Sequence, residues 1–374
     1  MLKKNKPDYF LLAAIVILIV WGFFTLATVS FPYSLEKYGN AWHYVKHQLF
    51  YGLLPGIVLA IIAFRAPIEF IKKISLPVFI INFILLVLLF IPGLGAEING
   101  ARRWLNINGT IFQPSEFIKL SFLVYISTWL ASRYKSKTLK EKTEKQTVIV
   151  FATIIIILAA MLIWQKDLST LIIIFIIGLL IYFASWAPRR NLLFLFLIIS
   201  LAVGLLIKLE PYRLNRVLTA LNPQADPLGK GYQLKQSMIS IGSGRIWGIG
   251  EFFGSGLGLS NQKFGFLPQP MTDSIFAIIG EETGFIGASL LIILFGLIFW
   301  RGIVALLRSQ DEFSRLLILG ITCWLVLQTF FNIAGITGIM PLAGIPLPFF
   351  SYGSSHLIIE MIGVGLLLNI SKHH

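Results

Sequence analysis

Residues 256–287, GLGLSNQKFGFLPQPMTDSIFAIIGEETGFIG, pass from a polar, glycine-rich segment into an apolar run that continues to Trp300. Asp273 lies at the junction, and Glu281 and Glu282 follow inside the apolar run. A bilayer-spanning helix needs about 17–25 mostly apolar residues. Charged side chains at membrane depth are costly and are rarely kept without a function. The stretch therefore predicts a membrane helix with a functional polar site at one end.

The composition of the whole chain also indicates a membrane protein. Of its 374 residues, 56% are hydrophobic and 13% are charged, and the mean hydropathy is +0.82. About a quarter of the residues in a soluble domain are charged. We expect an all-α integral membrane protein with about ten transmembrane helices, forming one polytopic unit over residues 1–374. The predicted spans lie at about 10–31, 49–65, 76–92, 116–132, 148–164, 168–186, 191–208, 274–300, 315–338 and 347–370.

The positive charges predict the orientation of the chain. Lysine and arginine gather near the N-terminus and in connections that share one side, such as 133–145 and 301–315. The positive-inside rule places that side, with both termini, in the cytoplasm. The longest connection, about 209–273 between the seventh and eighth spans, is then a large extracellular loop. Its amphipathic stretch, 232–241, predicts a short helix on the outer membrane surface.

The formal net charge is +14, and many cations fall on the predicted outer side. The chain has no nucleic-acid-binding motif, so nucleic acid is excluded as a partner. An anionic ligand that approaches from outside would explain why so many cations lie on the outer side. The outer cations include Arg102, Arg103, Lys119, Lys166, Arg213, Arg216 and Lys263.

Asp273 has two compatible interpretations. Thr272, Asp273 and Ser274 precede an apolar helix, and all three residue types favour the N-cap position. A carboxylate beside apolar walls is also suited to act as a general base. Capping and catalysis do not exclude each other, so we expect Asp273 to be the catalytic residue if the chain is an enzyme.

Glu281 and Glu282 lie deeper in the same helix. At 100° per residue they are about 80° and 180° around the helix from Asp273, so the two cannot both line one narrow groove with it. Intramembrane charges usually face a partner, which favours pairing with a cation on another helix. The sequence does not decide which of the two is structural.

A second polar group surrounds the predicted fourth span. Arg102 and Arg103 precede it, and Glu116 and Lys119 stand three residues apart at its start. The simple interpretation of the last two is a local ion pair. The alternative is that the three cations converge to bind a phosphate or pyrophosphate. For Asp167, a loop ion pair with Lys166 and a place in the polar cavity are equally open.

These segments together resemble the SEDS family, whose members include FtsW, RodA and SpoVE. The resemblance covers nearly the whole chain, including the ten-span layout and the large outer loop. It is carried by the stretches 99–104 (NGARRW), 112–116 (FQPSE) with Lys119, Tyr212 and Arg213 with Arg216, 226–229 (DPLG), 231–233 (GYQ), 241–244 (IGSG), Leu267 and Pro268 with Thr272 and Asp273, 276–282 (FAIIGEE), Asn332, Pro341, Gly344 and 346–353 (PLPFFSYG).

The resemblance implies a peptidoglycan glycosyltransferase of the bacterial cell membrane. Such enzymes polymerise lipid II, a disaccharide-pentapeptide on undecaprenyl pyrophosphate, and work with a class B penicillin-binding protein and other divisome or elongasome proteins. Asp273 matches the family's essential aspartate, and a divalent cation, Mg²⁺ or Mn²⁺, is left open as a cofactor. The residues expected to line the substrate cavity are Arg102, Arg103, Gln113, Glu116, Lys119, Arg213, Arg216, Lys263, Glu281 and Ser351.

The chain departs from the family pattern beside the aspartate. Gln269 and Met271 stand where members usually carry Glu and His, so a neighbour that tunes the base is missing. The segment 260–263 (SNQK) is more FtsW-like than RodA-like, which favours division over elongation. A lipid II flippase without a chemical step is the competing function, because charges in a bundle suit transport as well as catalysis. A third possibility is a scaffold protein that only recruits the penicillin-binding protein, which is a transpeptidase. That function would leave Asp273 without a role.

Overall fold

The computed structural model describes residues 7–98, 101–107, 110–133, 141–185, 229–249 and 260–372, with the single residues 196, 218, 219, 222, 226 and 258. Helices dominate it, as predicted. They are α1 (Tyr9–Tyr38), α2 (His43–Gln48), the π-helical turn η1 (Leu49–Leu53), α3 (Leu54–Arg65), α4 (Ile68–Leu88), α5 (Pro114–Arg133), α6 (Glu141–Trp164), α7 (Leu168–Ala184), α10 (Lys230–Ser243), α11 (Ile275–Arg308), α12 (Glu312–Ile336) and α13 (Ser354–Ser371).

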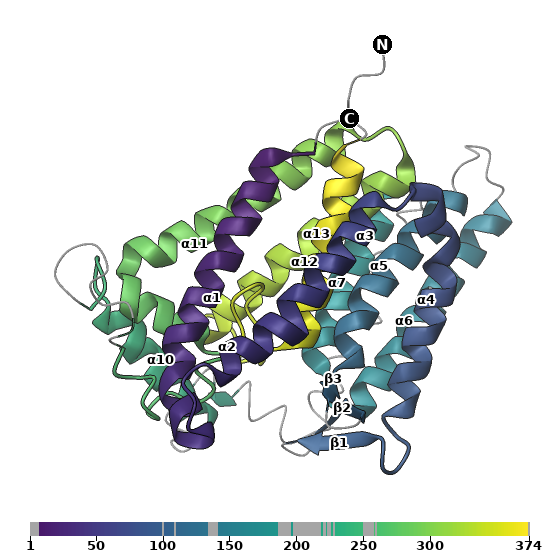
Figure 1. Cartoon of the computed structure of the whole chain (residues 1–374). Helices are drawn as coiled ribbons and strands as arrows, with labels where there is room; N and C mark the ends of the chain where they lie inside the picture. The colour runs from purple at the N-terminus through teal and green to yellow at the C-terminus, as the bar shows by residue number, and fades with distance from the viewer. Residues whose placement is uncertain are drawn as a thin grey trace.

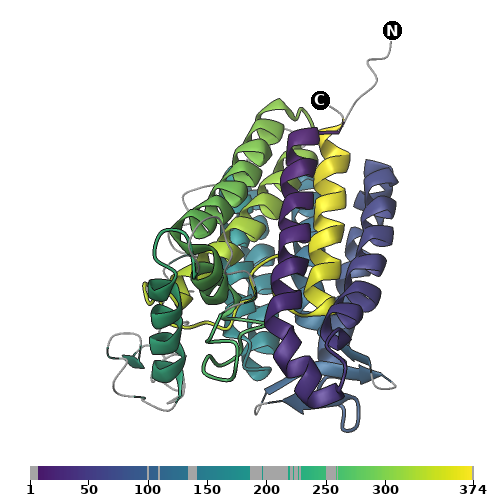
Figure 2. The ribbon, with the colours of Figure 1, turned by 60° about the vertical axis from the view of Figure 1, so that its left-hand side comes forward.

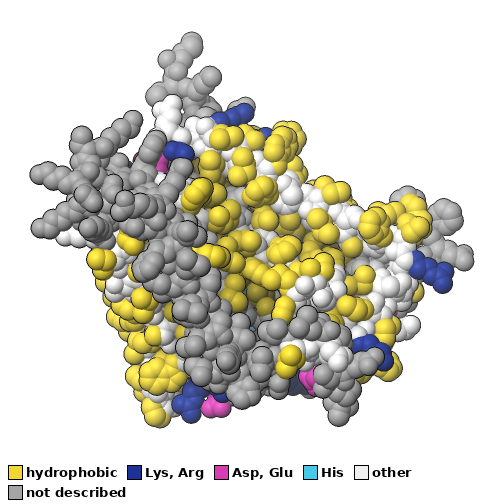
Figure 3. Space-filling model, turned by 180° about the vertical axis from the view of Figure 1, so that it is seen from behind, with side chains coloured by type: hydrophobic (Ala, Val, Ile, Leu, Met, Phe, Trp, Pro, Cys, Tyr) yellow, Lys and Arg dark blue, Asp and Glu magenta, His cyan; other side chains and the backbone are white. Residues whose placement is uncertain are grey.

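The helices form a bundle that suits a membrane. In the described part of the chain, seven helices are long and apolar enough to cross a bilayer. They run side by side, and both chain ends lie at the same end of the bundle (Figures 1 and 2). Hydrophobic side chains cover the described part of the rear face (Figure 3). The prediction of a multi-pass helical membrane protein is confirmed.

Nine of the ten predicted spans correspond to described helices, with ends shifted by a few residues. The seventh, 191–208, and most of the predicted outer loop lie outside the described residues. Helix α5 is not among the seven apolar helices because charged and hydroxyl side chains interrupt it. Most of its polar side chains, including Glu116 and Lys119, are nevertheless buried, since α4, α7, α12 and α13 pack around it. The amphipathic stretch 232–241 forms α10, as predicted.

A small antiparallel sheet, which was not predicted from the sequence, covers the end of the bundle opposite the termini (Figure 1). Strands β1 (Gly95–Ile98), β2 (Ala101–Ile107) and β3 (Thr110–Phe112) pair in the order β1-β2-β3. Leu105 of β2 is buried against the bundle, while Arg102 is exposed. Arg103 lies at an irregularity in the β1–β2 pairing, and its hydrogen bonds to the main-chain oxygens of Gln165 and Lys166 give it different partners from Arg102.

Helix α11 is broken at Gly284, whose φ of 65° and ψ of −164° are not helical. The break separates a short helical segment, 275–283, from the long membrane-crossing part. The segment 244–249 fills the break: the Phe285 and Ile286 amides donate to the Arg245 and Ile246 carbonyls, at 2.9 and 3.1 Å. Backbone groups released within a membrane protein must find such partners. The kink thus couples α11 to the connection that follows α10.

We expect Gly284→Ala to destabilise the protein by about 1–3 kcal/mol or more, the cost of holding a non-glycine residue in this region of φ and ψ. An added Cβ would also meet the Ile246 carbonyl oxygen at 2.5 Å. Thermal unfolding of the full chain in detergent measures the effect. Gly296→Ala is the matched control in the same helix, because nothing lies within 4 Å of the place that its new methyl group would occupy. An equal loss in both variants would contradict the prediction.

Candidate functional site

Asp273 lies in the turn just before α11. The N-cap residue is Ser274, not Asp273, and the Ser274 hydroxyl makes no capping bond. That hydroxyl instead donates to the Pro268 carbonyl oxygen, at 2.9 Å, and accepts from Gln233 Nε2, at 2.9 Å. The Asp273 side chain is half-buried. Its position is therefore not explained by capping.

The carboxylate of Asp273 faces residues 337–353, hereafter the 337–353 loop. A Cβ added to Gly344 would lie 3.2 Å from Asp273 Oδ2. The loop connects α12 to α13 without regular structure for most of its length, although Leu347, Phe349 and Phe350 are fully buried. Irregular backbone is tolerated at membrane depth only where protein groups satisfy its hydrogen bonds. Polar side chains of the surrounding helices supply those bonds.

Two side chains join the 337–353 loop to the backbone around Asp273. Asn332 Nδ2 donates to the carbonyl oxygens of Asp273 and Ile345, at 2.9 and 2.7 Å. The Ser351 hydroxyl donates to the Thr272 carbonyl oxygen, at 2.7 Å, and accepts from the Leu347 amide, at 2.8 Å. The backbone of the turn that carries Asp273 is thus held from both sides.

A buried polar network supports the loop from inside the bundle. Lys119 Nζ lies 2.7 Å from Glu116 Oε2 and 3.1 Å from Gln328 Oε1. Trp324 Nε1 donates to the same Gln328 oxygen, at 2.8 Å. The Gln328 amide in turn donates to the Pro346 carbonyl oxygen, at 3.1 Å, and to Glu360, at 3.4 Å. The predicted local ion pair of Glu116 and Lys119 is present, and the hydrogen-bond network starts from it.

Three further side chains complete the support of the loop. Glu360 Oε2 accepts from the Phe349 amide, at 2.9 Å. His356 Nε2 lies 2.9 Å from the Ser351 carbonyl oxygen, and Gln48 Oε1 accepts from the Gly353 amide, at 3.0 Å. Neither these residues nor Gln328 were predicted from the sequence to belong to the site. A signal was present for Gln328 and Glu360, which are polar residues inside apolar runs, whereas Gln48 and His356 follow other polar residues.

Glu281 and Glu282 hold the connection before α11 rather than facing Asp273. Glu281 accepts from the hydroxyls of Ser240 and Ser260, at 2.8 and 2.6 Å, and from the Asn261 amide, at 3.1 Å. Glu282 Oε1 lies 3.8 Å from Lys263 Nζ, which also donates to the Gly258 carbonyl. Both carboxylates are buried and engaged, so both have a structural role.

Lys263 is itself almost fully buried, so its cation is not available at the surface. Burial lowers the pKa of the Lys263 ammonium, and the Glu282 and Glu281 carboxylates oppose that shift. The pair of Lys263 and Glu282 matches the prediction that an intramembrane carboxylate faces a cation. The cation comes from a loop, however, and not from another helix.

The predicted outer cations do not share one set of partners. Arg102 Nε lies 3.1 Å from Glu97 Oε2 on the exposed side of the sheet. Arg103 donates to the main-chain oxygens of Gln165 and Lys166, between α6 and α7. Lys119 is enclosed in the bundle. Arg213 and Arg216 lie outside the described residues.

Two other predicted polar residues, Asp167 and Gln113, stand just before helices α7 and α5. Asp167 caps α7 through bonds to the Thr170 amide and hydroxyl, at 3.2 and 3.0 Å. Gln113 donates through its side-chain Nε2 to the Ser115 hydroxyl, at 3.1 Å, and through its backbone amide to the Ser355 hydroxyl, at 3.1 Å.

Within the described residues, no group of three or more His, Cys, Asp and Glu side chains is placed to hold a metal ion.

Comparison with known proteins agrees with this arrangement. Residues 9–374 match the FtsW, RodA and SpoVE family of cell cycle proteins. The chain is 36% identical to stage V sporulation protein E of Bacillus subtilis (strain 168), over 99% of this chain and 98% of the relative. It is 33% identical to a probable peptidoglycan glycosyltransferase FtsW of Geobacter sp. (strain M18), over 99% and 98%.

Solved structures share the fold over almost the whole chain. One belongs to a study of how a peptidoglycan synthase complex coordinates polymerization and crosslinking, with a TM-score of 0.78, 25% identity and 98% coverage of both chains. The rod shape determining protein RodA of Thermus thermophilus aligns with a TM-score of 0.69 and 23% identity, covering 98% of this chain and 96% of its own.

The fold and the site define a polytopic membrane protein in which a partly buried loop holds the turn that carries one acidic residue, just before a helix of the bundle. Within that class, the chain belongs to the FtsW, RodA and SpoVE family.

Proposed function

We propose that this protein polymerises lipid II into β-1,4-linked glycan strands at the outer face of the bacterial cell membrane. One observation carries the proposal: the turn bearing Asp273 is fixed by Asn332 and Ser351 against the 337–353 loop, whose residues 347–351 are buried. A membrane protein rarely keeps such an acidic residue without a function. The names of its relatives, probable peptidoglycan glycosyltransferases, support the same activity.

The chemistry requires one base and one leaving group. The GlcNAc 4-hydroxyl of the acceptor attacks the anomeric carbon of the donor, and Asp273 takes the hydroxyl proton. The bond between that carbon and the pyrophosphate oxygen breaks, and the undecaprenyl pyrophosphate leaves with the bonding electron pair. Attack opposite an α-linked leaving group gives a β bond, so the step inverts the configuration. A single carboxylate in range of the hydroxyl suffices as the general base.

Positive charge near the leaving pyrophosphate would stabilise it as it departs. We assign that role to Arg102 and Arg103 at the sheet, with Arg213 and Arg216 as further candidates. The contacts of Lys119 favour an indirect role, because its ammonium is enclosed by Glu116 and Gln328. Lys119 would then support the 337–353 loop rather than touch the substrate.

The orientation follows from the positive-inside rule. Both termini lie at one end of the bundle, and the sheet lies at the other (Figure 1). We place the termini in the cytoplasm and the sheet outside the cell. The partner would be a class B penicillin-binding protein transpeptidase within the division machinery, for which the FtsW relatives and segment 260–263 argue, or within the elongation machinery.

The test is to purify the full chain with its transpeptidase partner and supply lipid II. We expect glycan strands that a gel resolves and that lysozyme digests. Fluorescent lipid II in proteoliposomes tests the flippase alternative in the same preparation. Transport of lipid II across the bilayer without strand formation would contradict the proposed function.

A further inference from the structure

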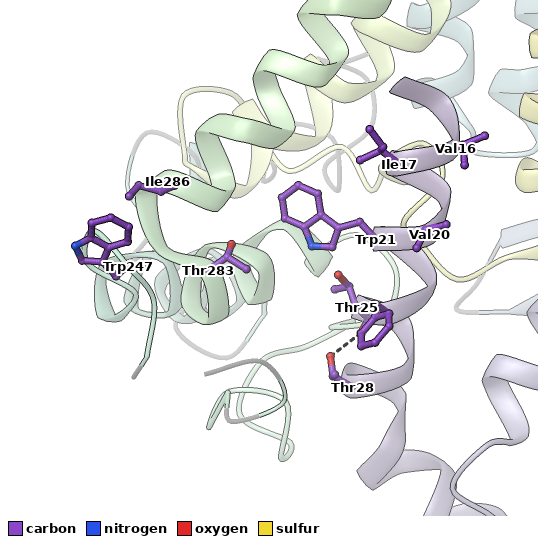
Figure 4. Close-up of a pocket in the computed structure, with 10 residues that line it drawn as sticks. Val16, Ile17, Val20, Trp21, Thr25, Thr28, Trp247, Thr283 and Ile286 are labelled. Carbon is purple, nitrogen blue, oxygen red and sulfur yellow. Dashed lines mark hydrogen bonds between the residues drawn. The ribbon is translucent and has the colours of Figure 1, made fainter. Parts of the chain in front are cut away.

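An apolar cavity of about 640 Å³ lies between α1 and the kink of α11 (Figure 4). Its α1 wall runs from Val16 to Thr28. Thr283 and Ile286 of α11 lie opposite, with Trp247 from the segment that fills the kink. The volume falls within the range of about 300–1,000 Å³ that is typical of ligand pockets. The cavity is separate from the polar network around Lys119, because none of its lining residues belongs to that network.

The cavity has the depth and polarity of one membrane leaflet. From Val16 to Thr28 the helix rises roughly 18 Å, at 1.5 Å per residue, which is a little more than half of a hydrocarbon core about 30 Å thick. The wall is apolar toward the terminal end of the bundle and carries Thr25 and Thr28 toward the end that bears the sheet. Val20 is 58% exposed, so the cavity opens toward the surrounding lipid. A single hydrocarbon chain with a polar head fits this gradient.

Charged groups are buried next to the polar end of the cavity. The Thr28 hydroxyl donates to the Thr25 carbonyl oxygen, at 2.9 Å, and lies 3.5 Å from Glu282 Oε2. Glu282 is the carboxylate that pairs with Lys263. The connection that precedes Asp273 is therefore anchored beside the position where the polar head of a bound lipid would lie.

The apolar wall is also joined to the site. The Trp21 ring packs edge-on against Phe350, with ring centroids 5.7 Å apart. A Cβ at Gly22 would overlap the Phe349 carbonyl oxygen, so the α1 backbone rests directly on the 337–353 loop. Ser351, the next residue of that loop, holds the Thr272 carbonyl. One helix thus lines the cavity and supports the loop that faces Asp273.

We propose that this cavity binds the polyprenyl chain of the lipid-linked sugar, with its diphosphate end at the level of Thr25 and Thr28. The inference rests on the proposed function, which requires a lipid-linked substrate. A transmembrane helix of a partner would need a groove through the whole bilayer, and the cavity extends through about half of it. A branched, flexible chain suits the apolar and aromatic wall that Val20, Trp21 and Phe24 provide.

The test is photocrosslinking of the full-length protein in phosphatidylglycerol nanodiscs. The photoreactive p-benzoylphenylalanine replaces Val20 in one protein and Ile81 of α4 in the control. The two positions are matched, because Val20 and Ile81 are 58% and 56% exposed. The probe is tritiated undecaprenyl phosphate. We expect labelling at Val20 at least about tenfold above that at Ile81, a preference equivalent to burial of about two methylene groups.

Labelling at Val20 should saturate, and unlabelled undecaprenyl phosphate should compete where dioleoylphosphatidylglycerol does not. Equal labelling at the two positions, or equal competition by the phospholipid, would show that the cavity is ordinary lipid-facing surface and would overturn the proposal. Cross-linking to a co-purified protein in place of the probe would overturn it as well.

The experiment separates this inference from the proposed function, because labelling requires no catalysis. Saturable labelling at Val20 in a protein that forms no glycan would refute the polymerase and keep the lipid site. Glycan synthesis with equal labelling at Val20 and Ile81 would refute the lipid site and keep the polymerase. As a second measurement, Val20→Trp should raise the KM for lipid II several-fold with little change in kcat, while Ile81→Trp should change neither.

Discussion

Asp273→Asn should reduce the polymerisation of lipid II by a factor of about 10²–10⁴, the range that a positioned general base contributes. Asparagine has nearly the same shape as aspartate but cannot take the proton of the acceptor hydroxyl. The fold should survive, because Asn332 and Ser351 bind main-chain carbonyls at residues 273 and 272 and not the side chain that changes. Glycan strands are measured on gels with the transpeptidase partner present, and thermal unfolding in detergent is measured on the same sample.

Asp311→Asn is the matched control. Asp311 also stands before a long membrane helix, where it caps α12 through the Ser314 amide, at 3.1 Å. Asparagine is an equally good cap, so we expect that variant to keep both its stability and its activity. Full polymerisation by Asp273→Asn would end the assignment of the base, whereas a loss of folding would call for the more conservative comparison with Asp273→Glu.

The helical framework was predictable because the bilayer imposes it. Long apolar runs can only satisfy their backbone as helices in lipid, so nine predicted spans correspond to described helices. The sheet was not predicted, because residues 95–112 mix glycine, charge and short apolar pieces without a clear period of two. The last predicted span, 347–370, was too long at its start. Its apolar residues 347–350 are buried in a loop, and hydropathy alone does not distinguish buried loop from helix.

Asp273 was predictable because a charge stands at the edge of an apolar helix. The support of its turn was not, because Asn332, Gln328 and Glu360 bind backbone groups of an irregular loop, which no helical or strand spacing indicates. Spacing along the chain also grouped Lys119 with Arg102 and Arg103, although the fold gives each a different environment. Local patterns thus indicate which residues carry charge, and only the packing shows which charges already have partners.

The second large effect concerns Lys119. Lys119→Met should destabilise the protein by about 3–5 kcal/mol, the cost of leaving a buried charge without its partner. Glu116 would be that charge, since its side chain is 6% exposed and lies 2.7 Å from the ammonium. Gln328 would lose one of its donors, and with it part of the support for Pro346. Thermal and denaturant unfolding in detergent measure the loss.

The double variant Glu116→Gln/Lys119→Met separates structure from catalysis. It removes both charges, so most of the lost stability should return, as for other buried pairs that are replaced together. Because the ammonium is enclosed by Glu116, Gln328 and the Trp324 ring, 5.5 Å away, we expect polymerisation to recover with stability. Restored stability without restored glycan synthesis would show instead that Lys119 reaches the pyrophosphate, and the leaving group would then have a cation inside the bundle.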